Sequence, residues 1–231
     1  MQTRRFLVTG GSQGIGAALV TQARAAGHQV VFTGRHQTRI AEVEQATGAH
    51  GVAADITVDA DNARTVEECQ RRLGGIDVLI NNAGIGYSAE MGSLDVGRMR
   101  GVFSTNVFGM VDLTNRIVPL MKSQASGDIV NLASTSGMKA AKGGTAYAAS
   151  KWAIRGITQC WQAELRPHGI RVVCICPSEV QTNWMGRGGR NNPNKLFAED
   201  IAATIMAGLS MPGRVLWTEL AIFANNPWKE D

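Results

Sequence analysis

Short apolar runs alternate along the chain with stretches in which apolar residues recur every three to four positions. The runs are rich in branched residues and are typical of strands buried on both faces. We predict strands at residues 5–10, 29–34, 50–55, 76–84, 127–134, 170–177 and 219–224. The stretches between them predict helices at residues 14–27, 37–48, 65–75, 96–124 and 145–169.

Strands that are apolar on both sides and alternate with helices predict an α/β fold. We expect a single doubly wound, Rossmann-like domain over residues 1–231, with a seven-stranded, mostly parallel sheet and helices on both faces. A chain of 231 residues that is 44% hydrophobic is long enough to bury one such core. The segment 182–197, rich in Gly, Asn and Arg, is expected to be a flexible loop over the substrate site. A plain surface loop is the alternative.

Charge and composition narrow the function. The 23 Lys plus Arg and 19 Asp plus Glu give only +4, and the basic residues are spread along the chain, so we expect no nucleic-acid partner. No apolar leader and no run of eighteen apolar residues is present, so we expect a cytoplasmic protein without membrane contact. The four cysteines are expected to be buried thiols and not metal ligands, with strand alternation placing Cys174 and Cys176 on opposite faces.

The segment "YAASK" places Tyr147 four residues before Lys151 within a predicted helix. Residues at this spacing leave a helix on the same face, so the ammonium can reach the phenol. A cation about 4 Å away at an effective dielectric of ~20 contributes ~4 kcal/mol, which would lower the pKa of a tyrosine from about 10 to near neutrality. The pair is therefore a candidate for proton transfer. A solvated surface pair is the alternative.

The segment "TGGSQGIG", residues 9–16, follows the first predicted strand and leads directly into a helix. Small residues at such a turn let backbone amides and the helix N-terminus approach a pyrophosphate, although glycine turns also serve tight packing alone. The strict spacing of the dinucleotide fingerprint is absent. The candidate cofactor residues in this segment are Gly10, Ser12, Gln13, Gly14, Ile15 and Gly16.

The end of the second predicted strand, "FTGRH", bears on the choice of cofactor. Gly34 stands where a carboxylate would bind the adenosine ribose of NAD, and Arg35 follows it, with Arg39 one turn further on. A guanidinium pairs well with a phosphate, so Arg35 predicts that NADP(H) is preferred, with NAD(H) still possible. A solvated charge at the start of a helix is the alternative for Arg35.

With "TGGSQGIG", "NNAG" at 81–84, Asn106, Ser134 and "YAASK" in this order, the chain resembles the short-chain dehydrogenase/reductase family. The joint spacing, including the thirteen residues from Ser134 to Tyr147, is specific, and the match spans nearly the whole chain. The resemblance implies that Tyr147 is the general acid/base and that Ser134 hydrogen bonds the substrate oxygen. It also implies that Lys151 holds the nicotinamide ribose and lowers the tyrosine pKa, and that Asn106 continues a proton relay through a water.

The resemblance also extends the cofactor site. Asp55 and Ile56 match positions that contact adenine, and the segment "PSEVQT" matches a Pro-Gly-x-Val-x-Thr pattern except that Ser178 replaces the glycine. This replacement bears on the shape of the wall that would line the substrate site near Ser178 and Glu179. The further cofactor-binding residues implied by the resemblance are Asp55, Ile56, Asn82, Ala83, Gly84, Tyr147, Lys151, Pro177, Val180 and Thr182.

The C-terminal segment beginning "EDIA" is similar to the branch that contains serine 3-dehydrogenases and related NADP-dependent 3-hydroxy acid dehydrogenases. This similarity implies a small 3-hydroxy acid as substrate. Arg187, Arg190 or Lys195 in the 182–197 segment could then meet its carboxylate, with plain solvated charges as the alternative.

The sequence therefore predicts an NADP(H)-dependent oxidoreductase that interconverts a secondary alcohol and a ketone. By resemblance we expect a homodimer or homotetramer, and Phe103, Trp152 and Trp161 are candidate interface residues that could also belong to the core. A 3-oxoacyl thioester reductase is one alternative, although the "VDGG" type of ending is missing. A cofactor-sensing protein without turnover is another, but it would not need the proton relay.

Overall fold

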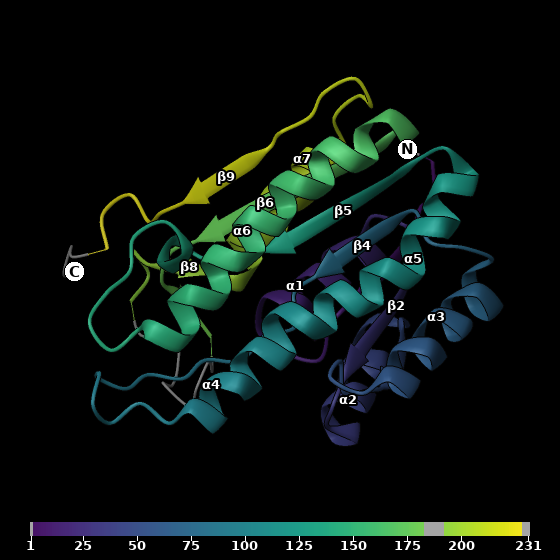
Figure 1. The fold of residues 1–231 in the computed structure, drawn as a ribbon. Helices are drawn as coiled ribbons and strands as arrows, with labels where there is room; N and C mark the ends of the chain where they lie inside the picture. The colour runs from purple at the N-terminus through teal and green to yellow at the C-terminus, as the bar shows by residue number, and fades with distance from the viewer. Residues whose placement is uncertain (1, 183–191, 228–231) are drawn as a thin grey trace.

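A seven-stranded parallel sheet forms the centre of the computed structural model, which describes residues 2–182 and 192–227 (Figure 1). The strand order is β3-β2-β1-β4-β5-β6-β9, and every neighbouring pair is parallel. All seven predicted strands are confirmed. Their bounds are β1 (Arg5–Val8), β2 (Gln29–Gly34), β3 (His50–Ala53), β4 (Val78–Asn81), β5 (Gly127–Leu132), β6 (Ile170–Pro177) and β9 (Glu219–Ile222).

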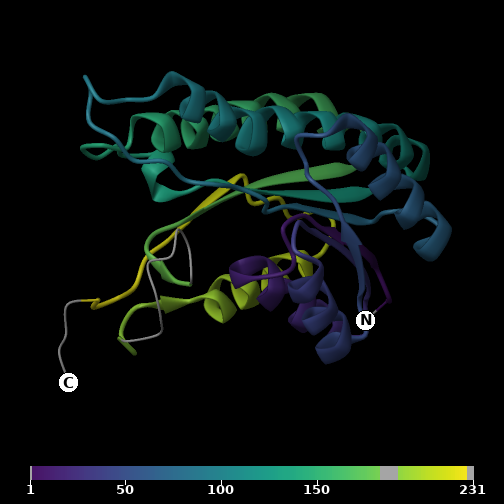
Figure 2. The same ribbon diagram turned by 90° about the horizontal axis from the view of Figure 1, so that it is seen from below.

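Helices cover both faces of this sheet, as the sequence predicts (Figure 2). One face carries α3, α5 and α6, and α4 continues this layer, whereas α1, α2 and α7 lie on the opposite face. No helix in residues 2–182 or 192–227 is long and apolar enough to cross a membrane. The helix bounds are α1 (Gly14–Ala25), α2 (Gln37–Thr47), α3 (Asp59–Leu73), α4 (Val96–Phe103), α5 (Met110–Gln124), α6 (Thr145–Leu165) and α7 (Ala198–Leu209).

The two apolar layers follow from strand alternation. In β1, Phe6 and Val8 pack in the cluster that includes α1 and α7, whereas Leu7 packs in the cluster that includes α3 and α5. All three side chains are buried, so this strand has no solvated face. A strand of this kind reads as a continuous apolar run, which is why the runs predict the sheet well.

Two helical predictions differ from the structure. Helix α3 begins at Asp59, six residues before the predicted start, because its first turn is polar and gives no apolar period; Asp59 and Asp61 instead favour the positive helix N-terminus. The single helix predicted at 96–124 is divided by a π-helical segment, η1 (Ser104–Gly109), between α4 and α5. The predicted helix ends at Gly48 and Gly74 are confirmed, with φ of 66° and 73°.

The expectation for the cysteines is wrong in two respects. Cys160 is exposed. Cys174 and Cys176 share one face of β6, and their Sγ atoms are 3.8 Å apart. Side chains alternate along a strand with a period of two, so residues two apart point the same way.

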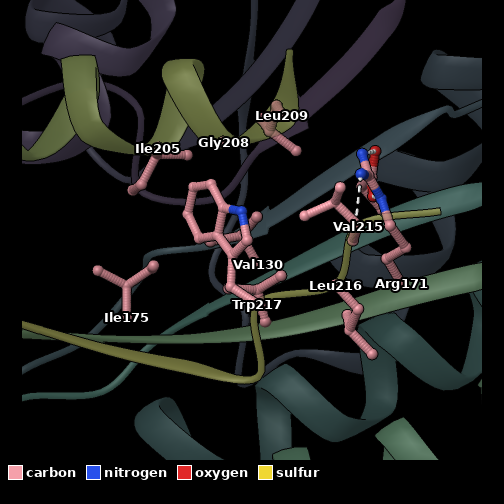
Figure 3. Close-up of a pocket in the computed structure, with 11 residues that line it drawn as sticks. Val130, Arg171, Ile175, Ile205, Gly208, Leu209, Val215, Leu216 and Trp217 are labelled. Carbon is pink, nitrogen blue, oxygen red and sulfur yellow. Dashed lines mark hydrogen bonds and ion pairs between the residues drawn. The ribbon is translucent and has the colours of Figure 1, made fainter. Parts of the chain in front are cut away.

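A narrow cavity between α7 and the sheet is filled by the indole of Trp217 (Figure 3). Its free volume is about 10 Å³, which is at most the room of one water molecule, so it is not a ligand site. The indole lies against Gly208 of α7, beside Ile205, Ile175 and Val130.

Gly208→Ala is expected to destabilise the protein. A Cβ at this position would lie 1.1 Å from Cζ2 of Trp217, so the indole would have to move. Overpacking of this kind costs about 1–3 kcal/mol, and each kcal/mol lowers Tm by about 2–4 °C in a chain of this size. Gly156→Ala is the matched control, because Gly156 lies inside α6 with nothing within 4 Å.

The control substitution should stabilise the protein by up to about 1 kcal/mol through helix propensity. Thermal melts of the two variants and the wild type measure both effects. A Gly208→Ala melt equal to or above that of the wild type would contradict the packing of Trp217 described above.

Candidate active site

The predicted site residues gather at the carboxyl ends of the central strands. The strand order reverses between β1 and β4, and ligands of open α/β sheets bind in the crevice at such a point. Gly10 follows β1, Asn82 follows β4, Ser134 follows β5, and Pro177 ends β6. Segments far apart in sequence therefore meet at one edge of the sheet.

The loop after β1 has the close backbone approach expected of a phosphate-binding turn. Gly10 and Gly14 have φ of 63° and 54°, a region that favours glycine. A Cβ at Gly16 would lie 2.3 Å from the Gly10 carbonyl oxygen, so only glycine lets the start of α1 pack on the loop. The amides at the N-terminus of α1 are left for a ligand or water.

Hydrogen bonds fix this loop to the end of β4. The Asn82 side chain donates from Nδ2 to the Thr9 carbonyl oxygen at 2.8 Å and to the Gly10 carbonyl oxygen at 3.1 Å. In return, the Thr9 hydroxyl accepts from the backbone N–H groups of Asn82 and Ala83, each at 3.0 Å. Sequence reasoning missed Thr9, although it opens the quoted motif. It joins the two segments that would face the pyrophosphate.

The end of β2 has no room for the carboxylate that NAD-specific sites use. A Cβ at Gly34 would lie 2.6 Å from Oγ and 2.8 Å from Cβ of Ser12. Arg35 is exposed beside this position, and the Arg39 guanidinium donates to Oε1 of Gln13 in the phosphate loop. The Arg39 guanidinium therefore lies at the phosphate loop, and Arg35 follows Gly34 directly in the chain, so an anion would be favoured here.

The segment after β3 is held in place by its own side chains. The Asp55 carboxylate accepts from the backbone N–H of Thr57 at 2.9 Å and from the Thr57 hydroxyl at 2.8 Å. The Ile56 carbonyl accepts from Asn62 at 2.9 Å, and a Cβ at Gly109 would come within 2.4 Å of the same oxygen. Asp55 and Ile56 thus form a fixed wall at the β3 side of the crevice.

Ser134 and Tyr147 interact at the end of β5. The Ser134 hydroxyl favours the ionised form of the Tyr147 phenol, and its oxygen accepts from the Ser136 backbone N–H at 3.1 Å. Ser134 is buried, and burial of the phenol raises the pKa of Tyr147, while the Ser134 side chain lowers it in part. The expectation that this phenol titrates near neutrality is therefore wrong for the structure, because sequence spacing does not reveal the desolvation.

Lys151 lies one turn after Tyr147, as predicted, and is only 4% exposed. Its Nζ donates to the Leu132 carbonyl oxygen at 2.7 Å and lies 5.6 Å from the centroid of the Tyr147 ring. Burial lowers the pKa of Lys151 to about 8. The group of the pair that titrates close to neutrality is thus the ammonium.

Asn106 sits in the π-helical segment η1 and is buried. Its Oδ1 accepts from the Ile85 backbone N–H at 2.8 Å, and its Nδ2 donates to the Ile85 carbonyl at 3.0 Å and to the Ser150 hydroxyl at 3.0 Å. The Ser150 hydroxyl in turn donates to the Tyr147 carbonyl at 2.7 Å. Ser150, which sequence reasoning missed inside "YAASK", thus links Asn106 to the helix that carries Tyr147. π-Helical segments often occur at functional sites.

Gly84 lies between Asn106 and Lys151. A Cβ at Gly84 would be 3.3 Å from Oδ1 of Asn106 and 3.8 Å from Nζ of Lys151. The structure therefore brings Asn106, Lys151, Tyr147 and Ser134 into one cluster next to the "NNAG" segment.

The segment after β6 returns to the phosphate loop. Val180 belongs to β7 (Val180–Gln181), which pairs in parallel with β8 (Leu196–Phe197). A Cβ at Gly14 would lie 3.5 Å from Cγ2 of Thr182, so this threonine stands beside the turn into α1. The Ser178 backbone N–H donates to the Ile222 carbonyl at 2.9 Å, so the serine does not disturb this turn.

The 182–197 segment is described only in part. Arg187 and Arg190 lie outside the described residues. Lys195 is described, and its Nζ is 3.1 Å from both carboxylate oxygens of Glu179. A substrate carboxylate would have to compete with Glu179 for this ammonium.

The residues fit a dinucleotide. The phosphate loop turns at Gly10 and Gly14, whose φ values are positive, and the N-terminus of α1 and the Arg39 guanidinium beside Gln13 supply positive charge. The cofactor-binding residues predicted from the sequence stay a prediction; they are Gly10, Ser12, Gln13, Gly14, Ile15, Gly16, Arg35, Asp55, Ile56, Asn82, Ala83, Gly84, Tyr147, Lys151, Pro177, Val180 and Thr182.

Comparison with known proteins agrees with this arrangement. Residues 4–192 match the family described as short chain dehydrogenase. An uncharacterized oxidoreductase of Staphylococcus saprophyticus is 34% identical over 228 residues, covering 96% of this chain and 97% of that protein.

Two solved structures share the fold over nearly their whole length. The closed form of serine dehydrogenase complexed with NADP+ has a TM-score of 0.88 and 25% identity, covering 94% of this chain and 93% of that one. The 3-ketoacyl-(acyl-carrier-protein) reductase from Brucella melitensis, complexed with NADH, has a TM-score of 0.88 and 26% identity, covering 96% and 97%.

Proposed function

The chain belongs to the short-chain dehydrogenase family of nicotinamide-dependent oxidoreductases, and we propose that it interconverts a secondary alcohol and a ketone with Tyr147 as general acid/base. The observation that carries this proposal is the arrangement of Tyr147, the Ser134 hydroxyl that interacts with it, and Lys151, whose Nζ lies 5.6 Å from the centroid of the Tyr147 ring. A proton donor, a second hydroxyl and a cation are thus held together on rigid elements.

Each member of the cluster has a separate task. The Tyr147 hydroxyl gives its proton to the substrate oxygen during reduction and takes it back during oxidation. Ser134 holds the same oxygen and stabilises the charge that develops on it. The nicotinamide supplies the hydride chemistry when bound.

Lys151 and Asn106 support the proton transfer. The Lys151 ammonium binds the ribose hydroxyls and stabilises the phenolate, while the Leu132 carbonyl fixes its position. Asn106, held by Ile85 and Ser150, orients a water that exchanges the proton with solvent. Both side chains are buried, so their positions are fixed by the surrounding protein.

NADP(H) is the proposed preferred cofactor. The support for this preference comes from side chains at the end of β2. Ser12 fills the space that a carboxylate at position 34 would need. Arg35 follows Gly34 in the chain, and Arg39 contacts Gln13 of the phosphate loop. The serine dehydrogenase structure described above contains NADP+, but the reductase from Brucella contains NADH, so the preference rests on these side chains.

Arg35→Ala is expected to weaken NADPH binding by about tenfold or more, because a hydrogen bond to a charged group is worth about 1.5–3 kcal/mol. NADH has no 2′-phosphate, so its affinity should stay within about twofold of the wild type. Fluorescence titration of both cofactors measures the ratio. Arg214→Ala is the control, since Arg214 is an exposed arginine before β9, at the other edge of the sheet.

The control variant should bind both cofactors normally. If Arg35→Ala weakened NADPH and NADH by the same factor, the side chain would support the loop in general, and the phosphate assignment would fail.

For the substrate we propose a small 3-hydroxy acid. The support is the serine dehydrogenase neighbour and the C-terminal similarity of the sequence. A 3-oxoacyl thioester is the second candidate, favoured by the similar structure of the Brucella 3-ketoacyl-(acyl-carrier-protein) reductase. The two candidate substrates differ in size, because a thioester substrate would carry a long arm that extends out of the site, whereas a free hydroxy acid would not.

One experiment tests the reaction and the substrate together. Purified protein with NADP+ or NAD+ is screened by absorbance against 3-hydroxy acids that include serine, and with NADPH or NADH against 3-oxoacyl thioesters. We expect turnover with a free hydroxy acid. Activity on thioesters alone would select the second candidate, and no turnover with any carbonyl or alcohol would reject the proposed reaction.

We also propose that the chain acts as a homodimer or homotetramer. Phe108 and Trp152 are exposed by 64% and 50% on the outer layer formed by α4, η1, α5 and α6, and Phe103 lies next to Phe108 with ring centroids 6.5 Å apart. Large exposed aromatic side chains of this kind favour a protein interface. Trp161, the third predicted residue, is half-buried against the core, which makes it a weaker interface candidate.

A further inference from the structure

Two thiols and a carboxylate meet beneath α6, one turn of helix beyond Lys151. Cys174 and Cys176 point from β6 toward α6, and Glu219 stands opposite Cys174 on the neighbouring strand β9. Their ligand atoms lie within 4.8 Å of one another. In residues 2–182 and 192–227, no other three His, Cys, Asp or Glu side chains meet in this way.

The spacing of the sulfurs matches a metal site. A tetrahedral ion bonded to two thiolates at about 2.3 Å separates the sulfurs by about 3.8 Å. The Sγ atoms of Cys174 and Cys176 are 3.8 Å apart, so the two sulfurs already have this spacing. We propose that Cys174, Cys176 and Glu219 bind a thiophilic divalent cation such as Zn²⁺. Binding forms two metal–sulfur bonds and one metal–oxygen bond and releases two thiol protons, without an oxidant.

A disulfide is a poor alternative for these thiols. Residues two apart in a strand have Cα atoms about 6.6–6.8 Å apart and parallel side chains, whereas a disulfide needs Cβ atoms about 3.8 Å apart. β6 cannot pucker to close that gap, because Cys174 is paired with Asn131 on one side and with Glu219 on the other. An ion bridges the two sulfurs where a covalent bond would break the sheet.

The charges balance around a divalent ion. The Arg155 guanidinium donates to Glu219 from Nε to Oε2 at 2.7 Å and from Nη2 to Oε1 at 2.9 Å. Two thiolates and a carboxylate carry three negative charges, which one divalent cation and Arg155 neutralise. The guanidinium also orients the carboxylate, as hydrogen-bonded groups behind metal ligands commonly do, and each oxygen keeps a lone pair for the ion.

A cavity borders one side of the site, while Cys174 and Cys176 are themselves buried. A cavity of about 360 Å³ lies between α6 and β9, with Cys174 and Glu219 in its wall. It has room for a hydrated ion to enter and for a water as fourth ligand. The other lining residues are Arg155, Thr158, Gln159, Gln162 and Thr218.

Cadmium titration of the reduced protein tests the site. Cd²⁺ bound to thiolates gives a charge-transfer band in the ultraviolet, and Co²⁺ in a tetrahedral, sulfur-containing site gives intense visible bands. We expect one Cd²⁺ per chain and a tetrahedral Co²⁺ spectrum. Native mass spectrometry of the wild type should also show one bound Cd²⁺ per chain, a measurement that requires no variant to fold.

Variants locate the ligands. Cys174→Ser and Cys176→Ser should each lose the band, and Glu219→Gln should weaken Cd²⁺ by about tenfold or more, as altered metal-site partners typically do. Cys69→Ser and Cys160→Ser are the matched controls, since these thiols lie on α3 and on the exposed side of α6. The absence of a stoichiometric band, or a band that survives in both β6 variants, would overturn the proposal.

Discussion

Tyr147→Phe is expected to lower kcat by about 10²–10⁴-fold in both directions, the usual contribution of a positioned general acid/base. The substitution removes only the phenolic oxygen, so the packing of the partly buried ring is kept. Ser134 would still hold the substrate oxygen but could not by itself supply a proton of matched pKa. Initial rates with the substrate found by the absorbance screen measure the loss.

Cofactor affinity separates this effect from a structural one. Binding of NADPH to Tyr147→Phe should stay close to the wild type, because the phosphate loop and Arg35 are untouched. Tyr87→Phe is the matched control: Tyr87 is the other tyrosine of the chain, it is buried, and its hydroxyl accepts from the Asp95 backbone N–H at 2.9 Å. We expect a far smaller change in kcat from this variant. Retention of a tenth or more of kcat by Tyr147→Phe would refute the acid/base role.

The sequence predicted the sheet and the cluster for different reasons. Residues 170–177 form an apolar run because β6 is buried on both faces, and no other element type explains such a run as well. Tyr147 and Lys151 were found because helical spacing fixes which side chains share a face. In both cases the information is local, so the pattern in one segment was sufficient.

The remaining features depend on contacts that no single segment contains. The π-helical turn that presents Asn106 arises within a helical pattern, and the approach of Thr182 to Gly14 joins residues 168 positions apart. The pKa directions of Tyr147 and Lys151 depend on burial by β5, α6 and the "NNAG" segment together. The Cys174–Cys176 pair was misjudged for another reason, since strand period alone puts both thiols on one face.

Burial changes how the proton relay must be understood. The pKa of Lys151 falls to about 8 while that of Tyr147 rises, so the first proton is lost from the pair near pH 8. When two such groups interact, the proton belongs to the pair and not to one residue. The state with phenolate and ammonium has the same number of protons as the state with phenol and amine. In the proposed mechanism, the state with phenolate and ammonium would be the one active in oxidation.

Lys151→Met is therefore expected to move the onset of oxidation from about pH 8 toward or above the ordinary tyrosine value of about 10. The lone buried phenol would have to ionise without a cation, and two pH units correspond to a loss of about a hundredfold in rate near pH 7.5. The measurement is kcat against pH in the oxidative direction at saturating cofactor, so that weaker ribose binding does not contribute.

Lys122→Met removes an exposed lysine from the last turn of α5 and serves as the control, with a pH profile expected to coincide with the wild type. An intermediate result has a clear interpretation: a Lys151→Met profile of normal shape but reduced height would mean that the lysine only positions the cofactor. An unmoved onset would show that another group sets the ionisation, because the methionine side chain of this variant has no proton to lose. A shifted onset, in contrast, would show that the cation sets the pH at which the phenol works.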